Sequence, residues 1–245
     1  MTEHAPEVCT PDGCGPAAST DAPVALPPAP SGTIDVISDA ICPWCWIGKR
    51  NMEAALAELG AQGLHFAVRW RPYQLNPDMP VEGVERAAYR ERKFGSLERS
   101  RQMDARLVEA GKVVGLDFRF DRMIRTPNTV AAHRVIRLAE AAGCQDAVVE
   151  ALFRAYFNEG RDIGDAATLA AVAAEAGLDG VAAMLASDEG AAEVVAEDMA
   201  ARRAGLDGVP SFLMERHLLF SGAMPGPNMA DAFRRAHAIL SARAA

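Results

Sequence analysis

Two cysteines separated by two residues, Cys42 and Cys45, stand where a strand pattern gives way to a helix pattern. Residues 33–38 alternate and are rich in β-branched side chains, which predicts a strand. Residues 47–60 carry apolar side chains at helical spacing, and Gly60 is typical of a helix end. This order of strand, dithiol and helix constrains the fold more than any other feature of the chain.

The position at the start of a helix has consequences for the chemistry of the first thiol. Unpaired backbone N–H groups and the positive end of the helix dipole favour a thiolate at Cys42. Pro43 suits the first helical position, because it has no N–H to lose and its φ angle is already set. Cys45 follows one turn later and can close a disulfide with Cys42 or resolve a mixed one. We therefore predict that Cys42 is the nucleophile and Cys45 the resolving thiol of a thiol–disulfide exchange site.

A Cys-x-x-Cys pair has two other interpretations, half of a zinc site or two thiols without a function. Zinc sites usually supply a second ligand pair at a characteristic interval. The strand-to-helix position favours the redox interpretation, and we expect no bound metal. A zinc-holding or chaperone-like binding module remains the alternative, with Cys9, Cys14, Cys42 and Cys45 as thiolate ligands.

The overall charge excludes some classes of partner. A net charge of −8 and a pI near 5.2 argue against nucleic acid and against an anionic membrane surface. No stretch approaches the length of a transmembrane span. The N-terminus shows no signal-peptide pattern, so we expect a cytoplasmic protein. Five cysteines in a reducing compartment are more typical of catalysis or metal binding than of a disulfide framework.

Residues 1–32 are rich in proline and almost free of large apolar side chains, which predicts a flexible tail. Within it, the turn sequence Pro-Asp-Gly would bring Cys9 and Cys14 together. One hypothesis is a mobile auxiliary dithiol that exchanges with the active-site pair, since the intervening chain has a reach of roughly 25 Å. The alternatives are an incidental surface pair and metal capture together with the active-site thiols.

Further strands and helices follow the dithiol. Residues 63–71 alternate as a second strand and complete a β-α-β unit. Residues 81–186 are predicted to be helical, and the charged stretches 85–94 and 97–114 are expected to be solvated helices. Residues 207–214, with Pro210 at the strand entrance, and the strand 217–223 form a predicted hairpin that precedes a last helix. Other expected features are a helix N-cap at 187–189, a cap at Asp165, and an apolar core stripe from Val149 to Phe157.

Several single residues have both a functional and a structural interpretation. Trp44 and Trp46 are candidates for a landing surface, meaning an apolar surface that a substrate protein contacts. Packing in the core is the alternative for Trp46. His133 is predicted to lie on the polar side of its helix and is not expected to bind a metal. His65 is expected to be structural or exposed. Cys144 is expected to be a half-buried residue at a helix end.

Three dispersed segments carry a resemblance to a known family. With Cys42-Pro43-Trp44-Cys45 after one strand and Gly208-Val209-Pro210 before another, the chain resembles thioredoxin-fold proteins. The long helical interruption resembles the DsbA family specifically. Residues 39–48, 71–80 and 128–134 are similar to its FrnE-like branch of bacterial dithiol–disulfide oxidoreductases and isomerases. The resemblance covers roughly residues 33–242.

The resemblance implies an α/β protein, a thioredoxin fold interrupted by a large all-helical insertion. Residues 33–75 and 187–245 would form the thioredoxin-fold domain, and residues 76–186 the insertion, with the tail outside both. It also implies that the Val209–Pro210 peptide is cis and lies beside Cys42, and that Pro43 and Trp44 tune the dithiol. The expected substrates are protein thiols and disulfides, handled through a mixed disulfide. No cofactor is expected, although glutathione or another thiol is a possible co-substrate.

A second function remains open on the same fold. A glutathione-dependent small-molecule isomerase that resembles 2-hydroxychromene-2-carboxylate isomerase would need no resolving thiol, so Cys45 counts against it. Secreted DsbA proteins carry a signal peptide, and this chain departs from them in that respect. The resemblance therefore does not favour a dedicated periplasmic oxidant.

Overall fold

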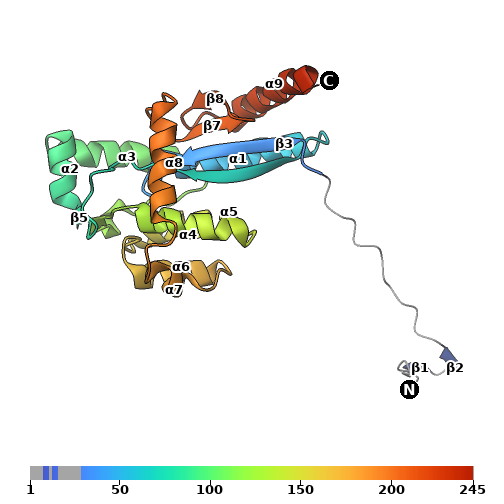
Figure 1. Ribbon diagram of the computed structural model, residues 1–245, viewed down its shortest axis with the longest axis horizontal. Helices are drawn as coiled ribbons and strands as arrows, with labels where there is room; N and C mark the ends of the chain where they lie inside the picture. Colours follow the sequence, from blue (N-terminus) through green and yellow to red (C-terminus); the bar gives the residue numbers. More distant parts are fainter. Residues whose placement is uncertain (1–7, 11–12, 16–28, 245) are drawn as a thin grey trace.

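The computed structural model describes residues 8–10, 13–15 and 29–244 (Figure 1). Near the N-terminus, β1 (Val8–Thr10) and β2 (Gly13–Gly15) pair in antiparallel fashion and place Cys9 directly opposite Cys14 in the backbone register. The side chains of these two cysteines lie outside the described part, and so does most of the predicted tail. The auxiliary dithiol therefore stays a hypothesis.

A four-stranded sheet in the order β4-β3-β7-β8 forms the centre of the fold. Strand β3 (Gly32–Ser38) runs parallel to β4 (Phe66–Pro72), and α1 (Pro43–Gly60) connects the two. This is the β-α-β unit that the alternating pattern predicts. The carboxyl end of β3 therefore leads directly into the Cys42–Cys45 segment.

The remaining two strands form the hairpin expected from the sequence. Strand β7 (Ser211–Met214) pairs antiparallel with both β3 and β8 (His217–Ser221). The two turn residues, Glu215 and Arg216, have positive φ angles of 47° and 67°. Such a pair of angles matches the twist of a two-residue hairpin turn. The hairpin brings the segment before β7 next to the end of β3, where the dithiol lies.

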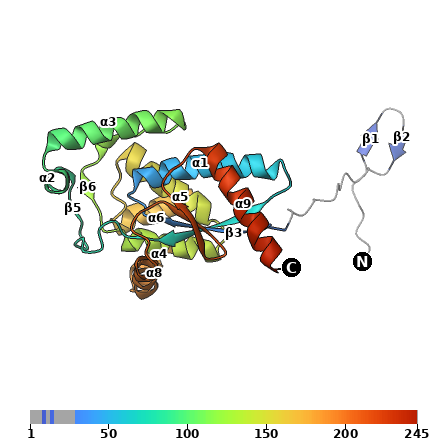
Figure 2. The ribbon, with the colours of Figure 1, turned by 90° about the horizontal axis from the view of Figure 1, so that it is seen from above.

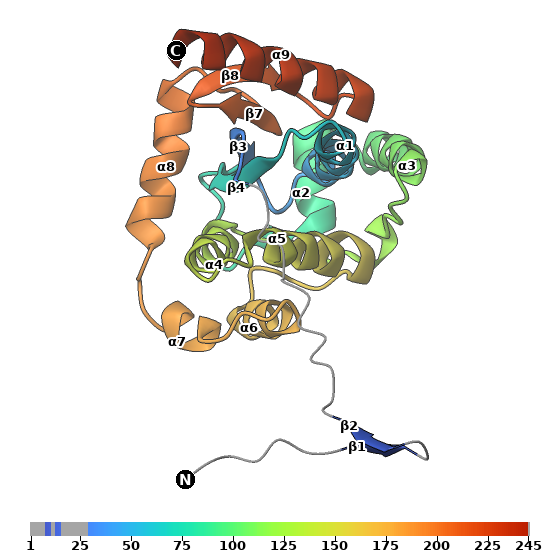
Figure 3. The same cartoon turned by 90° about the vertical axis from the view of Figure 1, so that its right-hand side faces the viewer.

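Helices cover both faces of the sheet (Figure 2). Helices α1 and α9 (Gly226–Ala244) pack against each other on one face, and α8 (Ala191–Arg203) lies on the other. Helices α4 (Val130–Ala141) and α5 (Gln145–Phe153) lie beside β4 (Figure 3). Within the described residues, no helix is both long and apolar enough to cross a membrane.

The chain between β4 and β7 is largely helical. Its further elements are β5 (Val84–Glu85), α2 (Arg86–Phe94), α3 (Leu97–Val113), the 3₁₀-helix η1 (Phe120–Arg122), β6 (Arg125–Thr126), the π-helix η2 (Arg154–Glu159), α6 (Ala166–Glu175) and α7 (Val181–Leu185). Asp165 caps α6 by accepting a hydrogen bond from the backbone N–H of Thr168, as predicted.

The predicted cap at residues 187–189 is wrong. Helix α8 begins at Ala191, and its N-cap is Gly190 in a left-handed conformation. The Ser187 hydroxyl instead donates a hydrogen bond to the carbonyl of Met184 at the end of α7. The acidic pattern after Ser187 resembles a helix start, but the Ser187 hydroxyl contacts the end of α7 and accepts a hydrogen bond from the N–H of Glu189 at 3.2 Å, before α8 begins.

One hydrophobic core extends from the sheet into the helical segment. Trp46 in α1 is buried, and its ring centroid lies 5.4 Å from that of Phe118, 6.2 Å from Phe153 and 6.0 Å from Phe157. The core alternative for Trp46 is therefore confirmed, and this indole cannot form part of a landing surface. The predicted core stripe from Val149 to Phe157 is also buried.

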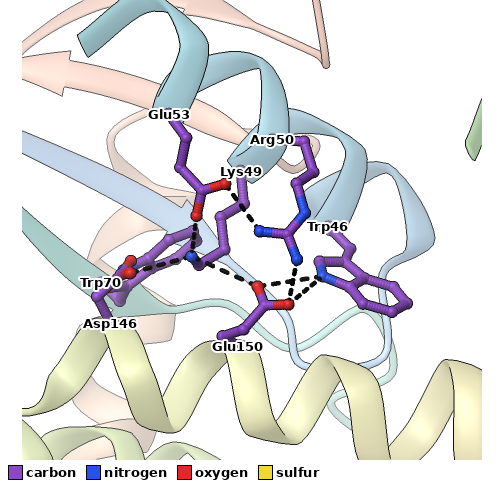
Figure 4. A network of polar contacts seen from close by, with 7 residues as sticks. All are labelled: Trp46, Lys49, Arg50, Glu53, Trp70, Asp146 and Glu150. Atoms are coloured by element: carbon purple, nitrogen blue, oxygen red, sulfur yellow. Dashed lines mark hydrogen bonds and ion pairs between the residues drawn. The ribbon is translucent and has the colours of Figure 1, made fainter. Parts of the chain in front are cut away.

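A charged network that includes Trp46 joins α1 to α5 (Figure 4). The Lys49 side chain is only 2% exposed and forms ion pairs with Glu53, with Asp146 at 3.0 Å and with Glu150 at 3.4 Å. The indole N–H of Trp46 donates to Glu150 at 3.3 Å. The ion pairs satisfy the buried ammonium and tie the dithiol helix to the helical segment.

Candidate active site

The dithiol lies where the sequence predicts, at the junction of β3 and α1. Cys42 is the N-cap residue of α1, with extended φ and ψ angles of −94° and 111°, and Pro43 opens the helix. The backbone N–H of Cys45 donates to the carbonyl of Cys42 at 3.0 Å, and that of Cys42 to the carbonyl of Asp39 at 3.0 Å. Both cysteines are free thiols. Cys42 therefore lies at the N-terminus of α1, and Cys45 lies in the first turn of this helix.

The two thiols differ in their access to solvent. Cys42 is 4% exposed but lines a pocket, whereas Cys45 is completely buried. Burial raises the pKa of the Cys45 thiol well above its ordinary value, and the hydrogen bond and charge of neighbouring Cys42 raise it further. A disulfide of a substrate can therefore reach Cys42 first. Cys45 lies behind Cys42 and is a protonated thiol.

The loop before β7 lies against the dithiol. The Val209–Pro210 peptide is cis, and the Cys42 Sγ donates to the Val209 carbonyl over 3.7 Å. The helix approaches this loop closely at Gly48, where an added Cβ would lie 2.9 Å from Cγ of Pro210. Glycine at this position therefore allows the proline ring to pack against α1. This arrangement is the one that the family resemblance implies.

A buried carboxylate holds the chain just before Cys42. The fully buried Asp39 accepts a hydrogen bond from the backbone N–H of Leu75 at 2.7 Å, and one carboxylate oxygen lies 3.4 Å from Nε2 of His133. The same His133 nitrogen lies 3.2 Å from the carbonyl of Tyr73. Asp39 thus links the dithiol segment both to the loop after β4 and to α4.

The prediction that His133 lies on a polar helix face is wrong, since this side chain is buried. Its partners are Asp39, which follows β3, and Tyr73, which follows β4, and both are distant in the sequence. The sequence did contain a signal. Asp39 and His133 both lie inside the segments that carry the family resemblance, although spacing alone could not pair them.

A pocket of about 290 Å³ opens beside Cys42. Trp44, which is exposed, and Val209 lie on its active-site side. Phe120 and Phe157 supply apolar lining, and the opposite side comes from α2 and α3. Sequence reasoning did not find this pocket, because α2 has the charged pattern of a solvated helix.

None of the residues of α2 is fully buried, as expected of a solvated helix, but one side of this helix lines the pocket. The side chains of Arg86 and Arg90 are mostly buried and point into the pocket lining, where both contact Asp104 of α3. The reason is that two aromatic rings offer them faces to pack on. The Arg86 guanidinium lies 5.4 Å from the Phe120 ring centroid, and that of Arg90 lies 4.3 Å from the Phe94 centroid.

Other candidate residues lie away from this constellation. Cys144 is half-buried at the N-terminus of α5, as predicted, and His65 is exposed just before β4. Among the residues that the structure describes, no group of three or more His, Cys, Asp or Glu side chains could hold a metal ion. The zinc alternative requires the side chains of Cys9 and Cys14, which lie outside that part.

The fold and site define a thioredoxin-like protein with a dithiol at a helix start. Residues 33–234 match the family model described as DSBA-like thioredoxin domain, so the chain belongs to this family. This confirms the predicted DsbA-like fold class. The match also supports the expected relation to DsbA-like oxidoreductases.

Three individual proteins show what this chain is similar to. The crystal structure of a probable DsbA oxidoreductase from Streptomyces coelicolor is 30% identical, with a TM-score of 0.75, and the alignment covers 84% of this chain and 89% of that one. The cytosolic disulfide reductase DsbM from Pseudomonas aeruginosa, solved with GSH, is 23% identical, with a TM-score of 0.57 and coverage of 86% and 98%. The uncharacterised protein YwbO from Bacillus subtilis is 26% identical over 147 residues, which are 60% of this chain and 67% of YwbO.

Proposed function

We propose that this chain is an FrnE-like thiol–disulfide oxidoreductase or isomerase that acts on protein disulfides. The observation that carries the proposal is the asymmetric dithiol. Cys42 lines an open pocket at the N-terminus of α1, and Cys45 is buried directly behind it. Such an arrangement separates the thiol that meets a substrate from the thiol that releases it.

The steps follow from this geometry. The Cys42 thiolate attacks one sulfur of a client disulfide, so that the client S–S bond breaks, one client thiolate leaves, and a mixed disulfide forms. Cys45 then loses its proton and attacks the Cys42 sulfur, which releases the second client thiol and leaves a Cys42–Cys45 disulfide. The client gains two electrons and the enzyme loses two. The reverse sequence donates a disulfide to a client.

Neighbouring groups are suited to hold an extended client segment. The cis Val209–Pro210 loop places backbone groups beside Cys42, and main-chain hydrogen bonds of this kind recognise extended peptides without regard to sequence. Exposed Trp44 supplies an apolar surface next to the thiol. In this proposal Pro43 and Trp44 also tune the reactivity of the dithiol, because they are the residues between the two sulfurs.

A thiol co-substrate and a cytosolic setting complete the proposal. DsbM from Pseudomonas aeruginosa is described as a cytosolic disulfide reductase and was solved with GSH. By analogy, glutathione or another small thiol would recycle the Cys42–Cys45 pair in the cytoplasm. No other cofactor is part of the proposed reaction.

Two cysteine variants test the function. Cys42→Ser should abolish both insulin reduction and the rescue of scrambled disulfides, since no nucleophile remains. Cys45→Ala should instead trap mixed disulfides with client proteins, visible as thiol-sensitive adducts on non-reducing gels. Full activity of Cys42→Ser would show that the proposed site is wrong.

The isomerase alternative keeps one supporting observation. A structure of 2-hydroxychromene-2-carboxylate isomerase has the same fold, at 14% identity and a TM-score of 0.55, and the pocket beside Cys42 combines cationic and aromatic side chains. An isomerase of that kind would not use Cys45. Unchanged glutathione-dependent turnover of a small aromatic carboxylate by Cys45→Ala, without trapped clients, would favour this alternative.

A further inference from the structure

The buried thiol of Cys45 has to lose its proton before it can attack a mixed disulfide, because the thiolate is the nucleophile. Burial raises the pKa of this thiol well above its ordinary value and outweighs the hydrogen bonds from the Ser38 hydroxyl and the Asp39 backbone N–H, which lower it. Neither of these two partners is a base that can hold a proton at neutral pH. The proton therefore has to travel beyond Ser38.

A small cavity borders Ser38 on the side of the helical segment. Its volume of about 10 Å³ is enough for about one water molecule. Ser38, Arg71 and His133 are its polar lining, and α5 contributes apolar side chains, those of Val149, Leu152 and Phe153. A buried water needs two to four polar partners, and these three residues can supply them.

A second cavity of about 10 Å³ continues from the first toward the surface. Arg137, Glu140 and Glu197 line it, and their side chains are 43%, 33% and 33% exposed. Four residues line both cavities, and His133 is the only base among them, because the Arg71 guanidinium stays protonated and pairs with Glu140 at 3.0 Å. His133 therefore lies between the cavity beside Ser38 and groups that reach solvent.

The contacts of the His133 ring define which of its nitrogens can accept a proton. Nε2 lies 3.2 Å from the Tyr73 carbonyl and 3.4 Å from the Asp39 carboxylate, and both of these groups are acceptors. In the neutral ring Nε2 therefore carries the hydrogen, and Nδ1 has the free lone pair. Nδ1 forms no hydrogen bond with any residue in the described part of the chain. A carboxylate beside Nε2 stabilises the imidazolium that forms when Nδ1 takes up a proton.

We propose that Ser38 and His133, joined by one water, carry the proton of Cys45 away when this thiol attacks the mixed disulfide. The inference rests on the proposed function, because it concerns the step that releases the client. Ser38 contacts the reacting sulfur and is a catalytic residue, whereas His133 acts through it.

The atoms and electrons balance in this step. The proton of Cys45 passes to the Ser38 oxygen, the hydroxyl proton of Ser38 passes to the water, and a proton of the water passes to Nδ1 of His133. The electron pair left on the Cys45 sulfur forms the bond to Cys42, and the client leaves as a thiolate with the electron pair of the broken S–S bond. His133 then returns its proton to solvent through the second cavity, and the client thiolate takes one up.

A chromogenic disulfide separates the attack of Cys42 from the attack of Cys45. Pre-reduced full-length protein, in which Cys9, Cys14 and Cys144 are replaced by serine, is mixed with excess 4,4′-dithiodipyridine in a stopped-flow instrument. Attack by Cys42 releases one thiopyridone at a rate that rises with the concentration of the reagent. Attack by Cys45 releases the second at a rate that does not depend on it. The absorbance trace therefore reports both steps as two phases.

Two variants interrupt the path at different points. His133→Gln keeps a side-chain N–H that can donate to the Tyr73 carbonyl but cannot take up a proton, and Ser38→Ala removes the hydroxyl without touching His133. Both should slow the second phase about a hundredfold at neutral pH, the lower end of what general-base catalysis contributes, and change the first phase by no more than about twofold. Thr129→Val is the matched control, because Thr129 is buried at the start of the same helix as His133 and lines neither cavity.

The pH profile distinguishes a proton path from a structural role of His133. The deficit of His133→Gln should shrink as the pH rises, because a growing fraction of Cys45 is then ionised without the relay. A displaced Cys45 would instead react more slowly at every pH.

The outcomes separate the inference from the proposed function. A slow second phase in both variants, with a deficit of His133→Gln that shrinks as the pH rises and with Thr129→Val unaffected, supports the relay. A second phase within about fivefold of the unsubstituted rate in either variant, a deficit that is constant with pH, or an equal loss in Thr129→Val would overturn it. If His133→Gln does not fold, the rate of Ser38→Ala decides. If the unsubstituted protein releases no second thiopyridone, the proposed function itself is wrong.

Discussion

Replacing Lys49 by methionine tests the charged network that joins α1 to α5. Methionine keeps most of the aliphatic length but removes the ammonium that contacts Glu53, Asp146 and Glu150. Breaking a fully buried ion pair costs about 3–5 kcal/mol. Here the side chains of Glu53 and Asp146 are 38% and 57% exposed, and Arg50 still contacts two of the carboxylates. We therefore expect the free energy of unfolding to fall by about 2 kcal/mol.

The pKa shifts in the network define the pH range of this effect. Burial lowers the pKa of Lys49, but Asp146 and Glu53 outweigh it and raise the pKa. Burial raises the pKa of Glu53, but the hydrogen bonds from Lys49 and Arg50 outweigh it and lower the pKa. The contribution of Lys49 to the free energy of unfolding is fully present below the pKa of an unfolded lysine, about 10.4. It is lost as the pH rises through the higher pKa of Lys49 in the folded protein. The contribution of Glu53 to the free energy of unfolding is fully present above the pKa of an unfolded glutamate, about 4.3. It is lost as the pH falls through the lower pKa of Glu53 in the folded protein.

Urea titration followed by circular dichroism at 222 nm measures the difference between wild type and Lys49→Met. The difference should be largest at neutral pH and should shrink at both extremes, with an unchanged m-value. Lys112→Met is the control, because Lys112 pairs with Glu109 on an exposed surface of α3 and should lose less than about 0.5 kcal/mol. Equal losses for the two variants would refute the reasoning.

Two further variants probe the dithiol itself. Gly48→Ala should slow insulin reduction about tenfold, because the new Cβ would lie 2.9 Å from the Pro210 ring and displace it. Gly60→Ala on the same helix should react at the wild-type rate, because its Cβ would meet only the His65 ring, at an ordinary contact distance of 3.6 Å. Equal slowing of both variants would contradict the steric argument. In the Cys42→Ser variant, iodoacetamide should alkylate Cys45 at least about tenfold more slowly than in urea-unfolded protein, because burial raises the pKa of this thiol and keeps it protonated. For the same reason, the alkylation rate should still increase with pH above about pH 9. Alkylation that levels off near pH 8.5 in the folded variant would show an ordinary thiol.

Local patterns were sufficient for much of the fold. The alternating run before Cys42, the helical spacing after it and the alternating run at β4 predicted the β-α-β unit that the structure shows. The hairpin of β7 and β8 and the Asp165 cap were also predictable. These features depend on residues a few positions apart, and neighbours along the chain determine their backbone conformation.

Residues whose partners are distant in the sequence could not be placed in this way. Periodicity put His133 on a polar helix face, whereas the structure buries it against Asp39, and Ser187 serves a different helix from the one its pattern suggests. No sequence pattern predicts that Lys49 is buried. It is buried because Asp146 and Glu150, which are about a hundred positions away, compensate its charge.

The sequence by itself determined the dithiol, its place between a strand and a helix, and the family to which the chain belongs. Only the tertiary structure decided which thiol is accessible, which indole is buried, and that the charged helix α2 faces Cys42 across a pocket. The physical reason is that burial and electrostatic environment are sums over neighbours in space. A helical pattern shows that Arg86 and Lys93 lie on a helix, but not what that helix faces.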